Sequence, residues 1–368
     1  MTRTDPPPPG IYPDVPEAEY RAWDAYNWSS LKRCAISMEQ FKYDWDHPDE
    51  SDTQAMFEGR MMHAFLADPK AAGERYVCVP AEYPTVVKAE GADVTVRSEG
   101  DSGDLFVVGQ GRGKARQTWD ASIMESGDGV VIQGSVPAGL IEVKMLPWGP
   151  GTSKFCQAWK ADARTDHIIT SQDVMARCKG MADRLLELPD VHAFLKNAMH
   201  EVSVTWIDPQ TNLACKARLD AWDGGGEIAD AKSSARPVDR DSFGWTVKKF
   251  GYAAQAGMYL DGLRAALKAM GKTVKGVMKF HLWAIQNFKP YTPRPYHLLD
   301  DPTGCPLSYE WLNYGRQHWH KHLQCVAHSL ETGEWPGHHH EGQPYPSTEE
   351  LLVPENMKLE PLEDERQI

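Results

Sequence analysis

Three short extended segments joined by two tight turns constrain the fold of this chain more than any other feature. The first segment covers residues 201–207 and alternates polar and apolar residues, as a half-buried strand does. Turn-forming residues at 208–212 separate it from a second extended segment, residues 213–222. Asp223-Gly224-Gly225-Gly226 then reverses the chain into the third segment, residues 227–232. The pattern predicts three neighbouring antiparallel strands.

The positions of the two turns predict the register of these strands. If the second turn centres on Gly225, Asp220 lies opposite Asp230. If the first turn centres between Gln210 and the residue after it, Glu201 lies opposite Asp220. The three acids would then share one row across the sheet.

Side chains alternate along a strand, so this row predicts a cluster of charge. Lys232 falls on the same face as Asp230, and Arg218 on the same face as Asp220. Three neighbouring carboxylates repel one another unless their pKa values rise or a divalent cation binds, and Mg²⁺ suits ligands that are all oxygen. The alternative is a solvated polar face of an antiparallel hairpin, which the spacing alone does not exclude.

Residues 250–260 predict a helix with a polar stripe. Tyr252, Gln255 and Tyr259 fall at positions i, i+3 and i+7, which share one face. An amide between two phenols can orient a phosphate or a nucleotide. The alternative places both tyrosines in the core and leaves Gln255 exposed.

An earlier helix is predicted from Gln54 to Ala67. It carries Gly59 and His63 one turn apart, and the glycine is expected to permit close packing beside the imidazole. The alternative is a histidine with a structural role.

These motifs occur in a characteristic order: a helix with G-x-x-x-H, then R-x-D, D-x-K, and a helix with Y-x-x-Q-x-x-x-Y. The combination resembles the PD-(D/E)XK nuclease superfamily, and within it the exonuclease VIII or RecE-type group of phages and prophages. The resemblance covers roughly residues 25–80 and 153–335. The matching residues are Gly59, His63, Glu201, Arg218, Asp220, Asp230, Lys232, Tyr252, Gln255 and Tyr259.

The resemblance implies an α/β fold, with a restriction-endonuclease-like core in which helices flank a central mixed β-sheet. It also implies a Mg²⁺ site, where Mn²⁺ would substitute, held by Asp220 and Asp230. The backbone carbonyl of Ala231 and either Glu201 or His63 would complete the ligand set.

The other matching residues receive roles in catalysis or DNA binding by the same resemblance. Lys232 would orient or deprotonate the attacking water and offset charge in the transition state. Gln255 and Tyr259 would position the scissile nucleotide. Arg218 and Tyr252 would join them in contacting DNA.

The implied activity is that of an exodeoxyribonuclease which degrades one strand of linear duplex DNA, 5′ to 3′, and leaves 3′ single-stranded tails for recombination. The implied partners are duplex DNA ends, a single-strand annealing recombinase and further copies of the chain in a homo-oligomer. The alternatives are an endonuclease or RNA-acting member of the superfamily, and a non-catalytic DNA-binding or assembly protein.

The expected domain organisation is a proline-rich arm at residues 1–24, a nuclease domain at 25–335 and an acidic, flexible tail at 336–368. A β-rich insertion at residues 85–152 interrupts the nuclease domain, where the family is expected to have a shorter link. Its role is predicted to be a lobe over the active site or a contact between subunits.

Composition sets broad limits on the class of protein. No apolar run is long enough to span a membrane and the N-terminus does not resemble a signal peptide, so a cytoplasmic location is expected. The resemblance implies a bacterial host and a phage or prophage gene. Seven scattered cysteines without a C-x-x-C pair speak against disulfides, zinc and a cysteine-ligated cluster.

The formal net charge of −13 is unusual for a DNA-binding protein, but acidic residues gather at the ends of the chain. Residues 349–368 alone carry seven acidic and two basic side chains. Basic residues such as Lys248 and Lys249 could line a track for DNA, and the alternative for them is ordinary solvated charge.

Overall fold

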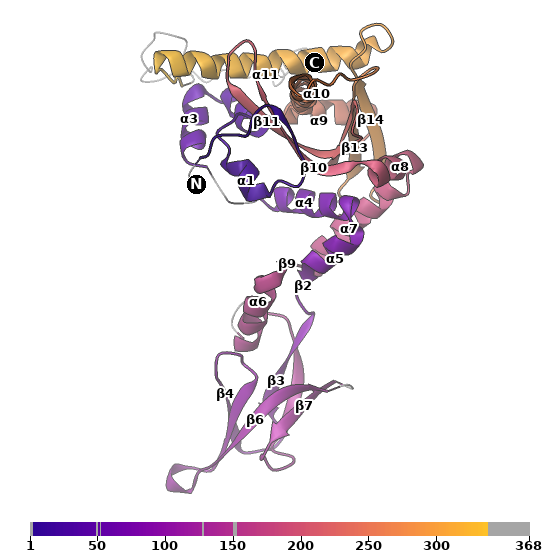
Figure 1. Cartoon of the computed structure of the whole chain (residues 1–368). Helices are drawn as coiled ribbons and strands as arrows, with labels where there is room; N and C mark the ends of the chain where they lie inside the picture. The colour runs from indigo at the N-terminus through magenta and orange to yellow at the C-terminus, as the bar shows by residue number, and fades with distance from the viewer. Residues whose placement is uncertain (1–2, 49–50, 52, 127–128, 150–152, 338–368) are drawn as a thin grey trace, which may run out of the picture.

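A six-stranded mixed sheet with helices on both faces forms the centre of the protein (Figure 1). The computed structural model describes residues 3–48, 51, 53–126, 129–149 and 153–337, so almost all of the predicted tail lies outside the described residues. The sheet order is β1-β10-β11-β12-β13-β14. Its strands are β1 (Gly10–Tyr12), β10 (Met199–Ile207), β11 (Ala214–Trp222), β12 (Glu227–Ser234), β13 (Lys279–Gln286) and β14 (Pro293–Leu299). The predicted α/β class, with a central mixed sheet flanked by helices, is confirmed.

Most of the helices in the described part of the chain lie between the strands of this sheet in sequence order, and only α11 follows its last strand. They are α1 (Glu17–Ala22), α2 (Trp28–Leu31), α3 (Met38–Asp46), α4 (Gln54–Ala67), α5 (Pro69–Arg75), α6 (Lys154–Asp166), α7 (Gln172–Leu186), α8 (Pro189–Asn197), α9 (Arg240–Phe250), α10 (Tyr252–Ala269) and α11 (Pro306–Thr332). Among the described residues, no helix is both long and apolar enough to cross a membrane.

The register between β10, β11 and β12 is the one predicted from the turns. β10 and β11 pair antiparallel with Val202 opposite Leu219, and β11 pairs with β12 with Ala221 opposite Ala229. β12 then runs parallel to β13, and a parallel neighbour requires a long crossover, which α9 and α10 provide.

The ladders are interrupted where the acidic residues lie. The pairing of β11 with β12 is confined to Ala221–Ala229 and the pair next to it, so Asp220 and Asp230 lie just past its end. Glu201 has a positive φ of 54° and is skipped in the pairing with β11. The three acids therefore lie at one level of the sheet, as expected, but in a place where its strands part.

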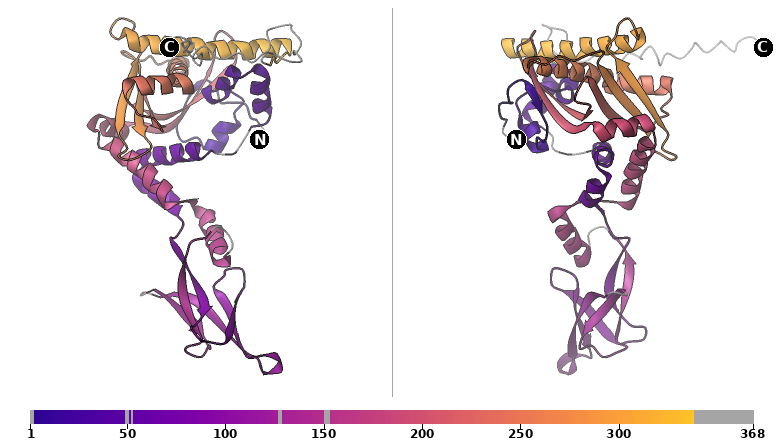
Figure 2. Two further views of the ribbon diagram at one scale, coloured as in Figure 1. Left: turned by 180° about the vertical axis from the view of Figure 1, so that it is seen from behind. Right: turned by 45° about the vertical axis from the view of Figure 1, so that its right-hand side comes forward.

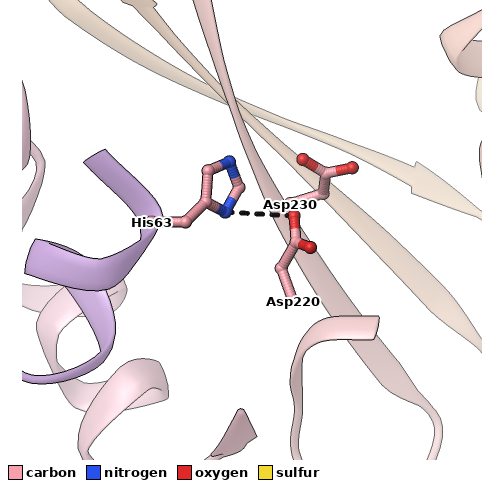
Figure 3. A group of neighbouring side chains, drawn as sticks. All are labelled: His63, Asp220 and Asp230. Atoms are coloured by element: carbon pink, nitrogen blue, oxygen red, sulfur yellow. Dashed lines mark ion pairs between the residues drawn. The ribbon is translucent and has the colours of Figure 1, made fainter. Parts of the chain in front are cut away.

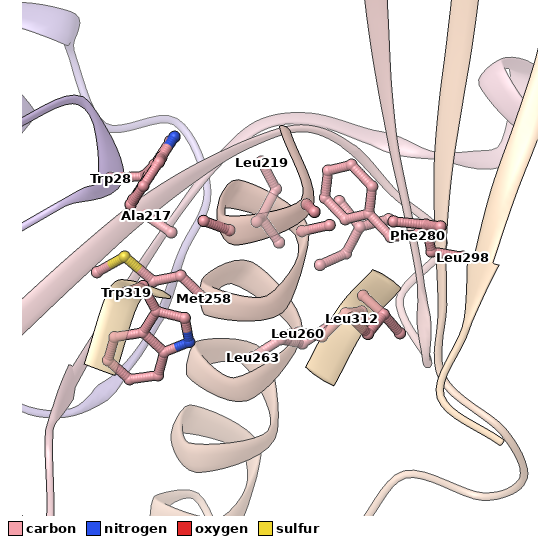
Figure 4. Packing of buried hydrophobic residues seen from close by; sticks show 14 of the residues in the cluster. Trp28, Ala217, Leu219, Met258, Leu260, Leu263, Phe280, Leu298, Leu312 and Trp319 are labelled. Carbon is pink, nitrogen blue, oxygen red and sulfur yellow. The ribbon is translucent and has the colours of Figure 1, made fainter. Parts of the chain in front are cut away.

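Two apolar clusters cover the two faces of the sheet. On one face, α10 packs on the strands and α11 packs across α10, around buried residues such as Leu260, Phe280 and Trp319 (Figure 4). The helices approach closely because residue 315 of α11 is a glycine. A Cβ at Gly315 would lie 2.0 Å from the carbonyl oxygen of Ala253. On the other face, α4 and α7 bury methionine and leucine side chains against β12 and β13.

The sequence patterns of residues 274–286 and 291–299 predict two further strands, and both strands begin later in the structure than these patterns do. β13 begins at Lys279 and not at Val274, because Gly276 has a positive φ of 87° and interrupts the extended chain. β14 begins at Pro293 and not at Tyr291, whose φ of 57° is left-handed.

The strands between residues 82 and 147 form two sheets of their own, away from the central sheet (Figures 1 and 2). β3 (Glu82–Lys88) pairs with β8 (Ile141–Pro147). β4 (Val94–Glu99), β5 (Leu105–Gln110), β6 (Gln117–Ser126) and β7 (Gly129–Gly134) form a four-stranded antiparallel sheet. A small apolar cluster that includes Val86 and Phe106 holds them together. Beside the short pair β2 (Tyr76–Cys78) and β9 (Ile168–Thr170), α5 and α6 connect this part to the rest.

Residues of the proline-rich arm are built into the fold. β1 pairs with β10, which places Gly10 opposite Thr205 at the edge of the central sheet. The buried Lys216 of β11 donates hydrogen bonds to the carbonyl oxygens of Tyr20 and Trp23, at 2.9 and 2.7 Å. The end of α1 is thereby fixed against the sheet.

Candidate metal centre

One histidine and two aspartates gather where β11 and β12 part. His63 of α4, Asp220 of β11 and Asp230 of β12 each offer a ligand atom, and these three atoms lie within 4.8 Å of one another (Figure 3). His63 Nδ1 is 3.1 Å from Asp220 Oδ2. Carboxylate and imidazole groups at this spacing could hold a metal ion.

Asp230 is the most buried member of this group, at 2% exposure. Its Oδ2 accepts hydrogen bonds from Lys232 Nζ at 2.6 Å and Gln255 Nε2 at 2.8 Å. Its Oδ1 is buried and has no hydrogen-bond partner within the described chain. A buried charged oxygen without a partner is costly, and a cation beside it would remove that cost. The residues present therefore fit a divalent metal ion.

His63 is held in one tautomer by its second ring nitrogen. Nε2 lies 2.9 Å from the carbonyl oxygen of Ala231, which can only accept, so Nε2 carries the hydrogen. Burial lowers the pKa of His63, so the ring is neutral and Nδ1 presents a lone pair toward Asp220. The carbonyl of Ala231, which was expected to bind a metal, accepts this hydrogen bond.

Asp220 lies opposite that lone pair, and it holds a proton more readily than an ordinary aspartate. Burial, followed by the carboxylates of Asp230 and Glu201, raises the pKa of Asp220 well above its ordinary value of 3.8. A protonated carboxyl group can donate to His63 Nδ1, which agrees with the 3.1 Å contact. Without a cation, a proton on Asp220 reduces the repulsion between the carboxylates, and a bound cation would take the place of that proton.

Lys232 contributes a permanent positive charge. Burial lowers its pKa, but the carboxylates of Asp230 and Asp220 outweigh that effect, and the net pKa is raised. Its Nζ also lies 4.9 Å from the centre of the Tyr252 ring. The ammonium group therefore stays charged between the carboxylates and α10.

The polar stripe of α10 faces the centre. Gln255 donates to Asp230, so the alternative of an exposed Gln255 is wrong. Tyr259 is hydrogen-bonded to Gln255, and burial raises its pKa. In this structure the stripe holds the Asp230 carboxylate in place.

Glu201 and Arg218 lie beside the centre, as an ion pair. Arg218 Nε is 2.7 Å from Glu201 Oε2, and Arg218 Nη1 donates to the carbonyl oxygen of Val15 at 3.0 Å. The Glu201 side chain is 50% exposed and is not one of the three clustered ligands. Arg218, expected to contact DNA, is occupied by these two partners.

The expected role of Gly59 is wrong. A Cβ built at this position meets nothing within 4 Å, so the glycine does not permit close packing beside His63. The imidazole is positioned by its two hydrogen-bonding partners.

A small cavity adjoins the centre, and two further polar residues lie nearby. The cavity, of about 20 Å³, is lined by His63 and Asp220 among others, and it has room for one water molecule or one ion. The ring of Tyr20 lies 5.6 Å from the Arg218 guanidinium, and the pKa of Lys32 is lowered by burial and by the charges of Arg33 and Lys232. Neither residue was predicted from the sequence, because neither stands at a spacing that would have linked it to the motifs.

Comparison with known proteins finds a distant structural likeness. No protein-family model matches the chain, and no curated protein matches it. Among solved structures, the chain is similar to the crystal structure of a presumed exonuclease from Eubacterium rectale. The two are 16% identical, with a TM-score of 0.33, and the match covers 52% of this chain and 71% of the other.

Proposed function

We propose that this chain is a Mg²⁺-dependent exodeoxyribonuclease of the PD-(D/E)XK superfamily. Its substrate would be linear duplex DNA, degraded on one strand in the 5′ to 3′ direction to leave 3′ single-stranded tails. The observation that carries the proposal is the buried, unpartnered Oδ1 of Asp230, which lies in a group with Asp220 and His63 and next to the ammonium of Lys232.

The chemistry of the donor set supports a hard divalent cation. Two carboxylates and a nearby backbone carbonyl supply oxygen ligands, which Mg²⁺ and Mn²⁺ accept, and His63 Nδ1 is available as a nitrogen ligand. A cation held there would act as a Lewis acid on a phosphate oxygen and lower the pKa of a bound water.

Lys232 would act by its charge in this centre. Because the raised pKa keeps it protonated at neutral pH, it is better suited to stabilise the developing negative charge on a phosphate than to take a proton from water. The role of general base, which the resemblance also left open, would need the uncharged amine.

Gln255 would act as a positioning residue. Its hydrogen bond to Oδ2 fixes the rotamer of Asp230 and leaves Oδ1 pointing away from other donors. The site thus combines the positioned carboxylate of Asp230, a proton that can leave Asp220, and the ammonium group of Lys232.

A purely structural ion pair explains the contacts less well. An Asp–Lys pair that served stability would have both carboxylate oxygens satisfied, since breaking or under-satisfying a buried charge costs several kcal/mol. Here one oxygen is unsatisfied and a second carboxylate lies within 4.8 Å.

The finer parts of the proposal rest on the order of the sequence motifs. These parts are the 5′ to 3′ polarity, the homo-oligomer and the single-strand annealing recombinase as partner. An endonuclease or an RNA-acting enzyme would use the same centre, and a DNA-binding protein without activity would need no bound metal.

The test uses 5′-phosphorylated linear duplex DNA and covalently closed circles, each with Mg²⁺ or with EDTA. We expect Mg²⁺-dependent loss of the linear DNA alone, abolished in Asp230→Asn and reduced at least about 100-fold in Lys232→Met. Glu227→Gln is the matched control, because Glu227 lies on the same strand but pairs with Lys279 and His281 away from the centre.

Each other outcome selects a different function. Cutting of closed circles would show an endonuclease, and cleavage of RNA alone would show an RNA-acting enzyme. If neither nucleic acid is cut and Mg²⁺ does not bind in calorimetry, the proposal is wrong.

A further inference from the structure

Helix α9 exposes two large aromatic rings on its outer face. Trp245 is 67% exposed and Phe250 is 53% exposed, while Phe243 and Val247 of the same helix are buried. A single exposed ring is common on a protein surface, but a patch that groups exposed rings marks a candidate binding site. Trp245 and Phe250 form such a group on α9.

Two lysines stand beside these rings. Lys248 Nζ lies 5.6 Å from the Trp245 ring centre, and Lys249 Nζ lies 5.7 Å from that of Phe250. Within the described chain, neither lysine has a carboxylate in ion-pair range. The surface thus alternates flat apolar rings with unpaired positive charges.

This surface continues into the candidate metal centre. The Phe250 ring stacks on the Tyr252 ring, with centroids 5.8 Å apart and an interplanar angle of 22°. Tyr252 in turn faces the ammonium of Lys232. Gly251, with a φ of 69°, turns the chain between α9 and α10 and brings the two rings together.

A groove of about 1000 Å³ borders the other side of Trp245, lined also by Tyr296, Trp311 and Tyr314. Its charged lining is balanced, since Asp241 and Glu310 accompany Arg240 and Lys248. Lys249, which does not line the groove, adds a further positive charge at the C-terminal end of α9, next to Tyr252.

We propose that the C-terminal half of α9 binds single-stranded nucleic acid on its way into or out of the metal centre. Unpaired bases stack on Trp245 and Phe250, and Lys248 and Lys249 neutralise the phosphates between them. This inference rests on the proposed nuclease function and names the form of substrate strand that α9 contacts. A duplex offers no free base faces to exposed rings, so the chemistry favours a single strand.

The test measures binding without cleavage. Full-length protein in EDTA is titrated into fluorescein-labelled oligothymidylate, and into a labelled blunt duplex, with fluorescence anisotropy as the readout. Trp245→Ala and Phe250→Ala should each weaken oligothymidylate binding by about 5- to 150-fold and affect the duplex less. Replacing both lysines with alanine should reduce the slope of log K against log salt by about 1.4.

The matched control is Tyr43→Ala, which removes another aromatic ring, 60% exposed, from α3. It should bind oligothymidylate as the wild type does. Because Trp245 and Phe250 are largely exposed, their replacement leaves the core intact, and unchanged circular dichroism will verify this.

The outcomes separate this inference from the nuclease proposal. Wild-type binding by both alanine variants, or no binding of oligothymidylate by the wild type, overturns the role of α9 even if the protein cuts DNA. If these variants bind more weakly but the wild type shows no Mg²⁺-dependent cleavage, the role of α9 in binding is supported and the nuclease proposal is wrong. If Trp245→Ala changes the sedimentation of the protein and not its binding, α9 is an interface between copies of the chain, and the proposal is wrong.

Discussion

Asp220→Asn should stabilise the metal-free protein, although it removes a proposed metal ligand. The asparagine amide mimics the protonated aspartic acid, because it can donate to His63 Nδ1 in the same place. It also removes a negative charge from beside Asp230. The substitution therefore relieves, permanently, the repulsion that a proton relieves in the wild type.

The size of the effect follows from the distance between the charges. The ligand atoms of Asp220 and Asp230 lie within 4.8 Å of each other, and two unit charges at that upper limit repel by about 3.5 kcal/mol at an effective dielectric constant of about 20. Lys232 offsets part of this, and the Asp220 side chain is 30% exposed, which screens it further. We expect Asp220→Asn to raise the free energy of unfolding by about 1 to 2 kcal/mol in EDTA at pH 8.

The sign of the pH dependence follows from the raised pKa of Asp220. From pH 3.8 up to that raised pKa, the folded protein holds a proton that the unfolded chain has released. The wild type therefore loses stability as pH rises through this window, and the variant does not. The advantage of Asp220→Asn should therefore be smaller at pH 5 than at pH 8.

Equilibrium urea unfolding in EDTA at the two pH values measures this difference. Added Mg²⁺ should make the wild type the more stable protein. Mg²⁺ at 100 times its dissociation constant stabilises the wild type by about 2.7 kcal/mol, and the variant has lost a side chain that coordinates the ion. Glu227→Gln provides a control of opposite sign. Burial raises the pKa of Glu227, but hydrogen bonds from His281 and Lys279 more than reverse this, so its amide should destabilise the protein at pH 8. An Asp220→Asn protein that is less stable than the wild type in EDTA at both pH values would refute the reasoning.

Three further predictions concern packing and positioning. Gly315→Ala should lower the free energy of unfolding by about 1 to 3 kcal/mol or more, because the added Cβ would overlap α10. Gly59→Ala should raise it by about 1 kcal/mol, because the added Cβ meets open space. Urea unfolding of the two variants measures both effects. Lys216→Met should cost about 3 kcal/mol, measured the same way, because three backbone carbonyls lose a buried donor, and equal stability would show that water replaces it. Gln255→Leu should weaken Mg²⁺ binding in calorimetry with little loss of stability, because it frees the Asp230 carboxylate to rotate; unchanged affinity would contradict the positioning role.

The sequence predicted the strands of the centre well because local turn chemistry determines them. Asp223 and the glycines after it allow one reversal, and that reversal aligns β11 with β12. The alternation of side chains along β12 then puts Lys232 beside Asp230. The polar stripe of α10 was predictable from helical periodicity alone. Each of these features depends on residues close together in the chain.

Contacts between distant segments were beyond prediction from periodicity. The hydrogen bond from His63 to Ala231 joins residues 168 positions apart, and a helix pattern does not reveal which way an imidazole turns. Gly59 led to a wrong prediction, because a glycine in a helix suggests close packing and, within the described chain, nothing packs against this one. The loss of pairing at Asp220 was also missed, since an alternating pattern assumes a regular ladder.

The departures from regular structure converge on one place. Glu201 has a left-handed backbone, the β11–β12 ladder stops before Asp220, and Asp230 keeps an unpartnered buried oxygen. Strained or unsatisfied groups of this kind cost of order 1 to 3 kcal/mol each, and a sequence shaped by stability alone would not concentrate them. A bound cation would offset the unpartnered oxygen and the carboxylate repulsion, but not the backbone strain of Glu201. Asp220→Asn removes only the repulsion, so the stability it gains should stay below the stability that Mg²⁺ gives the wild type.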